Sequence, residues 1–205
     1  PGLSLIIKEA GDFTSRIGTL APGTPIGLDG PFGHFTREDH PADAYLLIAG
    51  GVGIAPIMGL LRDLVALGHD GPVRLAYAAG DPDNFACLDE IAAAGSQLDL
   101  QSWLLSEEDA PGWQGDLGRL DRDRLRAMLD GLDPGRTVAL ICGPGPMVTA
   151  VSDTLVDLGM PMERVIYERF DYAGGTSAQD RRMRRRFLSL GAALGLGVAG
   201  FAALG

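Results

Sequence analysis

Short apolar runs alternate with stretches of helical periodicity over most of the chain from residue 45 onward. The apolar runs are 45–49, 73–78, 98–105, 137–142 and 164–168, and the helical stretches end near 68 or span about 84–94, 121–130 and 146–158. Short runs rich in β-branched residues predict strands, and strands that alternate with helices predict βαβ units. We therefore expect an α/β fold with a mostly parallel sheet that helices cover on both faces.

Residues 1–40 follow a different pattern. Apolar runs at 3–7 and 24–30 are separated by a segment rich in glycine and proline, with a helical turn or two after Gly11. This pattern is typical of the end of a β-domain. We expect the last strands of an antiparallel β-domain here, followed by the parallel domain over residues 41–170.

Charge and composition narrow the class of protein. The 205 residues carry a net charge of −10, which argues against a nucleic-acid partner because phosphate neutralisation needs a basic face. Two cysteines cannot form a disulfide framework and agree with a reducing compartment. A chain of this length accommodates one or two compact domains.

The C-terminal segment combines a basic run with an uncharged one. Five arginines fall within 181–186 at the end of a polar stretch that begins at 171, and residues 187–205 are apolar or small. Nineteen such residues would rise about 28 Å as a helix, close to the thickness of a bilayer core. The sequence predicts a linker over 171–186 and a transmembrane helix over 187–205, with the preceding domain membrane-associated on the cytoplasmic side. A buried core helix is the alternative. Since the sequence begins at Pro1 and stops inside this run, we expect a piece of a longer protein.

The sequence AGGVGIAP lies between an apolar run and a helical stretch. Its candidate ligand-binding residues are Gly50, Gly51, Val52, Gly53 and Pro56. Glycines permit a tight turn and a close approach of the backbone to a ligand, and proline is tolerated in a first helical turn. Free amides at such a helix start would face a pyrophosphate. The alternative is a strand-to-helix turn that only needs small residues.

Three further motifs carry candidate chemistry. Cys142 ends an apolar run and is followed by Gly143, Pro144 and Met147, although a cysteine there can also be a small buried hydrophobe. Glu168 and Phe170 end the last apolar run. In isolation, Gly11–Thr14 and Gly30–Phe35 read as turns with aromatic anchors.

Together these motifs resemble the ferredoxin-NADP reductase superfamily, and most closely its ferric reductase and NADPH oxidase branch, over about residues 3–170. The resemblance implies the C-terminal part of an FAD-binding β-barrel domain over 1–40 and an NAD(P)-binding domain over 41–170. It also implies hydride transfer between a nicotinamide nucleotide and FAD. The flavin-binding signature of an Arg, an aromatic residue and a Ser or Thr is absent from this sequence, so we expect this chain to hold FAD poorly.

The resemblance assigns a role to each motif. The flavin would contact Gly11, Asp12, Phe13, Thr14, Gly30, Phe32 and Phe35, and the nicotinamide nucleotide would contact the AGGVGIAP glycines, Val52, Pro56, Gly143, Pro144 and Met147. Cys142 would lie next to the reacting carbon of nicotinamide with Glu168 nearby, and Phe170 would stack on the flavin ring. No metal site is predicted.

The choice between NADH and NADPH depends on residues 75–118, which contain no lysine or arginine. NADPH-using members of the family place one arginine after the second strand of this domain and another beside a serine after the third. Those places correspond here to Gly80–Asp81 and Ser106–Glu107. A carboxylate accepts hydrogen bonds from ribose hydroxyls but repels a phosphate. We therefore expect the chain to use NADH. The alternative is that these acids are only a solvated face and that Arg74 or Arg119 reaches the 2′-phosphate of NADPH.

The sequence leaves three functions open. The first is transfer of electrons from NADH through FAD to a membrane haem b, a ferric chelate or another acceptor. The second is a reductase component that feeds an oxygenase or an iron–sulfur partner. The third is a redox-silent, membrane-tethered nucleotide-binding module.

Overall fold

The computed structural model describes residues 3–9, 11–30 and 32–170. Six strands form one sheet in the order β4-β3-β2-β1-β5-β6, and every neighbouring pair is parallel. The strands are β1 Ala44–Gly50, β2 Pro72–Ala79, β3 Asp99–Ser106, β4 Asp116–Leu117, β5 Thr137–Pro144 and β6 Val165–Phe170. The predicted parallel α/β fold is confirmed.

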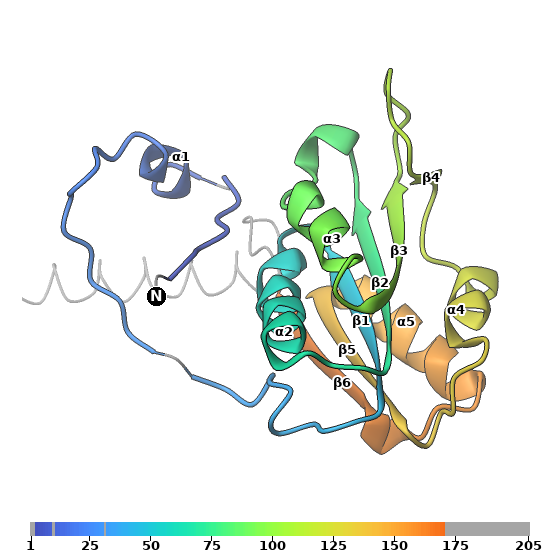
Figure 1. Ribbon diagram of the computed structural model, residues 1–205. Helices are drawn as coiled ribbons and strands as arrows, with labels where there is room; N and C mark the ends of the chain where they lie inside the picture. The colour runs from blue at the N-terminus through green and yellow to red at the C-terminus, as the bar shows by residue number, and fades with distance from the viewer. Residues whose placement is uncertain (1–2, 10, 31, 171–205) are drawn as a thin grey trace, which may run out of the picture. The chain divides into compact units, whose positions relative to one another are not determined.

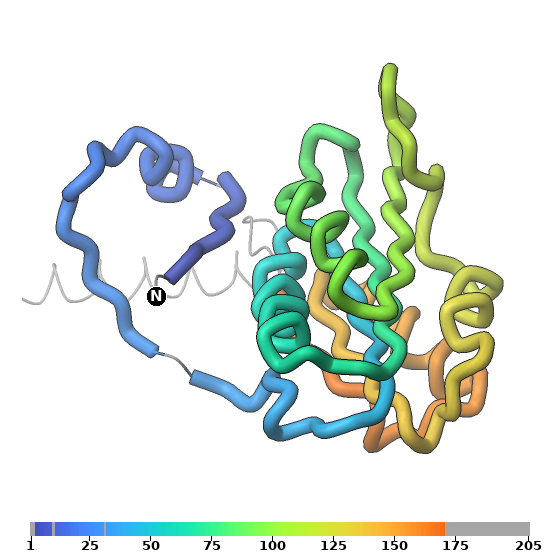
Figure 2. The backbone as a smooth tube through the Cα atoms, in the orientation of Figure 1, coloured from blue at the N-terminus to red at the C-terminus, as the bar shows by residue number. Residues whose placement is uncertain are grey.

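Helices cover both faces of the sheet (Figure 1). Helices α2 (Ile54–Leu67) and α3 (Leu88–Ala94) pack on one face, and α4 (Arg122–Leu129) and α5 (Gly145–Asp157) pack on the other. The backbone tube in Figure 2 shows the same layering. Helix α2 ends at Gly68, whose left-handed conformation (φ 67°) suits glycine.

Strand β1 lies in the interior of the sheet, and all seven of its residues are buried. Tyr45, Leu47 and Ala49 point into the core beneath α2, whereas Leu46 and Ile48 point into the core beneath α5. Because successive side chains of a strand alternate between faces, a strand covered on both sides is apolar throughout. The continuous apolar run in the sequence is explained by this position.

The segment before β1 differs from the expectation. Its described residues contain one short helix, α1 (Thr14–Ile17), and no strand. The expected strands over 3–7 and 24–30 are therefore absent from the described part of the chain, and Leu3, Leu5 and Ile26 remain more than half exposed. A strand needs a hydrogen-bonded neighbour, and no described segment pairs with either run. Assignment of this segment to an FAD domain stays a prediction.

The predicted linker over 171–186 and membrane span over 187–205 lie outside the described residues. Within the described residues, no helix combines the length and apolar character needed to cross a bilayer. Membrane attachment stays a prediction from the sequence.

Candidate active site

The order of the strands creates a switch point beside β1. Strands β2, β3 and β4 extend the sheet on one side of β1, and β5 and β6 extend it on the other. The connections after β1 and β5 therefore diverge at the carboxyl ends of two neighbouring strands. In open parallel sheets, ligands bind in the crevice at such a point.

In the glycine turn after β1, two glycines are tightly packed and one borders open space. A Cβ atom on Gly53 would overlap the carbonyl oxygen of Cys142, and one on Gly50 would overlap the Met147 side chain. Gly51 has a φ of 54° and no atom within 4 Å of its Cβ position. Gly50 and Gly53 therefore let the turn pack against β5, while Gly51 borders open space. Both readings of the motif, as a packed turn and as a place for a ligand, agree with this geometry.

Two helices begin at the crevice. A 3-10 turn at Gly51–Gly53 leads into α2, and α5 starts directly after β5. A Cβ on Gly143 would lie 3.4 Å from the Cα of Gly50, so the two strand ends approach closely. Helix starts present unpaired amides and the positive end of the helix dipole. Two helix starts at one sheet edge are features that can bind the pyrophosphate of a dinucleotide.

Cys142, Glu168 and Phe170 meet at this edge of the sheet. Cys142 pairs in register with Glu168 on β6, and Phe170 packs against the same core cluster that contains Cys142. Cys142 is only 4% exposed. Burial, and secondarily the negative charge of Glu168, raises the pKa of the Cys142 thiol from 9.0 to about 11. The thiol is thus neutral at physiological pH, and it can position a ligand but does not act as a nucleophile.

This raised pKa predicts slow alkylation of Cys142. Since the thiolate is the reactive form, we expect iodoacetamide at pH 8 to modify Cys142 about 100-fold more slowly than an unperturbed, accessible thiol. Glu168→Gln should speed the reaction only partly, because burial is the larger cause of the shift. Peptide mass spectrometry measures both rates, with the partly exposed Cys87 as the internal reference. Equal rates at the two cysteines would contradict the assignment.

The turn before β1 also reaches this corner. A Cβ on Gly33 would lie 3.7 Å from Oε1 of Glu168, and Phe35 packs against the core beneath α2. The Gly30–Phe35 turn therefore lies near Glu168, and its expected place beside the flavin stays a prediction. Phe32 is 82% exposed, which leaves an aromatic face that a flavin ring could cover.

The segment Gly11–Thr14, which the resemblance also assigns to the flavin, leads into a helix. Helix α1 begins at Thr14, whose hydroxyl donates to the Gly11 carbonyl at 3.1 Å. Gly11 and Asp12 are exposed, and Phe13 is 79% exposed. The predicted short helix after Gly11 is present, and its role toward FAD stays a prediction.

Asp81 and Ser106, the two residues expected near the ribose, differ in their surroundings. Asp81 lies after β2 and accepts a hydrogen bond from the amide of Asp83 at 2.8 Å, which leaves its second carboxylate oxygen for a ligand. Ser106 is fully buried, and its hydroxyl donates to the Glu108 carbonyl at 2.6 Å. In this structure the hydroxyl bonds within its own loop, and the expected contact of Ser106 with the cofactor stays a prediction.

Both alternative cations already have hydrogen-bond partners within the domain. Arg74 is 8% exposed and donates to the carbonyls of Val73 and Asp99. Arg119 forms a two-bond fork with Glu107, at 2.9 and 3.0 Å. Sequence reasoning missed this ion pair, because nothing in the spacing of the two residues indicates that they meet.

A parallel sheet with a glycine turn and two helix starts at its switch point defines a nucleotide-binding domain of the doubly wound class. Residues 47–153 match the family model described as the oxidoreductase NAD-binding domain, just over half of the chain. The chain belongs to this family.

The relatives are electron-transfer reductases. The chain is 30% identical over 155 residues to the reductase component of propane 2-monooxygenase from Rhodococcus jostii, covering 74% of this chain and 42% of that protein. It is 27% identical to NADH-cytochrome b5 reductase 1 from Laccaria bicolor, covering 79% and 54%. The chain thus spans about half the length of the curated relatives it matches. These relatives support the superfamily resemblance and not the ferric reductase branch in particular.

Solved structures show the same fold. The cytochrome b5 reductase domain of Ulva prolifera nitrate reductase superposes with a TM-score of 0.67 at 24% identity, covering 78% of this chain and 65% of that chain.

Proposed function

We propose that the chain binds NADH in the crevice between β1 and β5 and delivers hydride to FAD within an electron-transfer reductase. The observation that carries this proposal is the placement of Cys142 and Glu168, in register, beside the glycine turn. The relatives named as reductase components of monooxygenases favour an oxygenase or a similar redox protein as the acceptor over a ferric chelate or haem.

The protein's own part in this reaction is positioning. The amides of the Gly51–Gly53 turn bind the pyrophosphate, and the neutral Cys142 thiol packs beside the nicotinamide ring and excludes water. Glu168, exposed at the same corner, holds its carboxylate toward the ring edge. FAD, when bound, supplies the chemistry that accepts a hydride and releases single electrons. Such orientation of two reacting groups can account for a large part of a rate enhancement.

The choice of NADH rests on the ribose region. The carboxylate of Asp81 can accept from a ribose hydroxyl, whereas Arg74 is buried and Arg119 is already paired with Glu107. A 2′-phosphate would lie among acidic groups, and the exposed Arg119 is already neutralised by Glu107. This arrangement favours NADH.

The complete protein tests the proposal under anaerobic conditions. We expect NADH to bleach the flavin absorption band at least about 10-fold faster than NADPH at equal concentration. The 2′-phosphate of NADPH would lack the charge-assisted hydrogen bonds that a cationic partner supplies. Haem bands that become reduced in the same experiment would identify a haem acceptor. A spectrum that neither nucleotide changes would overturn the proposal in favour of a redox-silent nucleotide-binding module.

Membrane attachment through residues 187–205 is a separate proposal that rests on the sequence alone. Sedimentation of the complete protein with the membrane fraction, and its loss on removal of 187–205, is the result we expect.

A further inference from the structure

The segment that leads into β1, residues 34–42, is held against the nucleotide-binding domain at both of its ends. Phe35 and Ala42 pack against the core beneath α2. The Tyr45 hydroxyl on β1 accepts from the amide of Ala42 at 3.0 Å and donates to the carbonyl of His40 at 3.2 Å. The position of this connecting segment is therefore set by the domain that follows it.

Arg37 joins the middle of the connecting segment to helix α2. Its Nε atom donates to Oδ2 of Asp63 at 2.6 Å, and its side chain is only 18% exposed. The amide of His40 donates to the Arg37 carbonyl at 3.1 Å, which closes a turn around this residue. Hydrogen bonds between ionised groups are short and strong, and partial exclusion of water strengthens them further. Arg37 is thus anchored on α2.

Helix α2 connects this ion pair to the glycine turn. The helix begins at Ile54, directly after Gly53, and Asp63 lies about 14 Å further along its axis. Because a packed helix is a rigid element, the ion pair and the glycine turn keep a fixed separation. The ion pair therefore sets where Arg37 lies relative to the amides that we propose bind the pyrophosphate.

The chain just before the connecting segment reaches Glu168. A Cβ atom on Gly33 would lie 3.7 Å from Oε1 of Glu168. The stretch from Gly33 to Arg37 spans at most about 14 Å even when extended, so a displacement of Arg37 would be passed on to the turn at Gly33. The resemblance places this turn beside the flavin. The Arg37–Asp63 pair thus links the flavin side of the site to the helix that starts at its nucleotide side.

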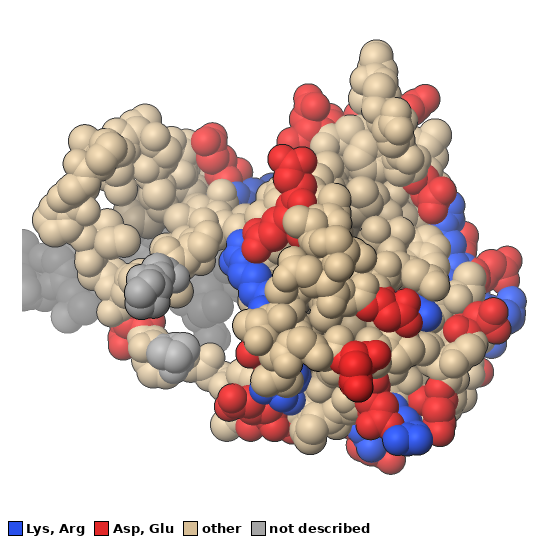
Figure 3. Space-filling model, viewed as in Figure 1, with Lys and Arg blue, Asp and Glu red and all other residues tan. Residues whose placement is uncertain are grey.

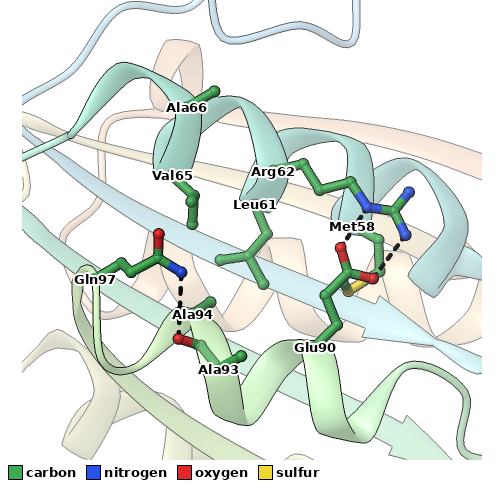
Figure 4. A pocket seen from close by; sticks show the side chains of 9 residues that line it. All are labelled: Met58, Leu61, Arg62, Val65, Ala66, Glu90, Ala93, Ala94 and Gln97. Atoms are coloured by element: carbon green, nitrogen blue, oxygen red, sulfur yellow. Dashed lines mark hydrogen bonds and ion pairs between the residues drawn. The ribbon is translucent and has the colours of Figure 1, made fainter. Parts of the chain in front are cut away.

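Ion pairs are common on this surface, so the chemistry of the Arg37–Asp63 pair does not by itself distinguish it. On the face shown in Figure 3, basic side chains lie beside acidic ones. Arg62, next to Asp63 in sequence, forms a fork with Glu90 on α3 at 2.6 and 2.7 Å (Figure 4). That fork joins two helices on the same face of the sheet. The Arg37–Asp63 pair differs because it joins α2 to the segment that follows the Gly33 turn.

We propose that Arg37 is a positioning residue, whose ion pair with Asp63 fixes the turn at Gly33 and so the separation of flavin and nicotinamide. The inference rests on the proposed function and deepens it. Arg37 acts through the backbone of the connecting segment and not by contact with a reacting group. Rates of reaction between held groups depend steeply on their separation and orientation. A loosened turn should therefore slow hydride transfer and leave the affinity for NADH, which depends on the glycine turn, unchanged.

Stopped-flow reduction of the flavin in the complete protein separates these two effects. We expect Arg37→Gln to lower the rate at saturating NADH about 10-fold and to leave the dissociation constant of NADH within about twofold. Asp63→Asn should have the same effect, and the double variant should be no slower than either single one, because both substitutions remove one interaction. Arg62→Gln and Glu90→Gln, which break the neighbouring fork, should leave the rate unchanged.

Hydrogen exchange provides a readout that does not depend on activity. The amides of Asp39 and His40 are hydrogen-bonded within the connecting segment, to the Thr36 hydroxyl and the Arg37 carbonyl. We expect these amides to exchange about 10-fold faster in Arg37→Gln, because local opening becomes easier, whereas the amides of α2 and β1 keep their protection. A substitution that only destabilised the whole domain would speed exchange in all three regions. Thermal melts of every variant report whether it is folded.

The outcomes separate the role of Arg37 from the proposed function. Faster exchange in Arg37→Gln with an unaltered rate of hydride transfer would overturn the inference, since the ion pair would hold the segment without positioning the reaction. A slower rate that Asp63→Asn does not reproduce, or that Arg62→Gln reproduces equally, would overturn it as well. If NADH does not reduce the flavin of the unaltered protein, the proposed function itself fails and this inference fails with it.

Discussion

Cys142→Ala is expected to slow hydride transfer from NADH about 100-fold in the complete protein, a loss typical of a small misplacement of reacting groups. The thiol is buried at the carboxyl end of β5 beside Glu168, so its removal leaves a gap where the nicotinamide ring would be held. The affinity for NADH should change little, because the pyrophosphate contacts lie on the glycine turn. Stopped-flow measurement of flavin reduction separates the rate from the affinity.

The control for this prediction is Cys87→Ala. Cys87 directly precedes α3, belongs to neither β5 nor β6, and is partly exposed. We expect its removal to leave flavin reduction unchanged. An unaltered rate in Cys142→Ala would instead mean that the cysteine is only a core residue, and hydride transfer at this site would have to be abandoned.

Gly53→Ala is expected to damage both stability and binding. The added methyl group would overlap the carbonyl oxygen of Cys142, which is backbone and cannot rotate away. Overpacking of this kind costs about 3 kcal/mol of the free energy of unfolding, and the displaced turn would no longer present its amides to a pyrophosphate. We expect the affinity for NADH to fall more than about 10-fold, since each tenfold corresponds to about 1.4 kcal/mol. Chemical denaturation and calorimetry measure the two effects.

A glycine in the adjacent helix provides the matched control. Gly59 lies in α2, is exposed and has open space around its Cβ position. Gly59→Ala should stabilise the chain by about 0.5–1 kcal/mol through its higher helix propensity and leave NADH binding intact. Loss of binding in this variant as well would show that the turn is sensitive to any change in α2.

The sheet was predictable because its strands are buried on both faces. The run at 137–142 is almost wholly apolar, and the structure extends it only to Thr137–Pro144. Helical periodicity likewise identified α2 and α5 with boundaries close to those observed. Strand β4 could not be predicted from hydrophobic periodicity, because it has only two residues, Asp116–Leu117, and both are exposed.

The site was only partly predictable. The sequence placed Cys142 and Glu168 at strand ends, and parallel pairing was enough to bring them together. The burial of Ser106 and its bond to the Glu108 carbonyl could not be predicted, because both depend on the conformation of the loop after β3. The fork between Glu107 and Arg119 depends on how a loop returns past β4, which no local pattern reveals.

The position of β1 between β2 and β5 has a consequence for how the chain folds. Ala49 pairs with Tyr77, which follows soon after it, but also with Cys142, which is made far later. Until β5 has been synthesised, one long edge of the most apolar strand has no partner and is open to pairing with other chains. Contacts so distant in sequence form slowly. The nucleotide crevice is therefore among the last features to assemble during synthesis, and a nascent chain that stalls before residue 144 exposes an aggregation-prone edge.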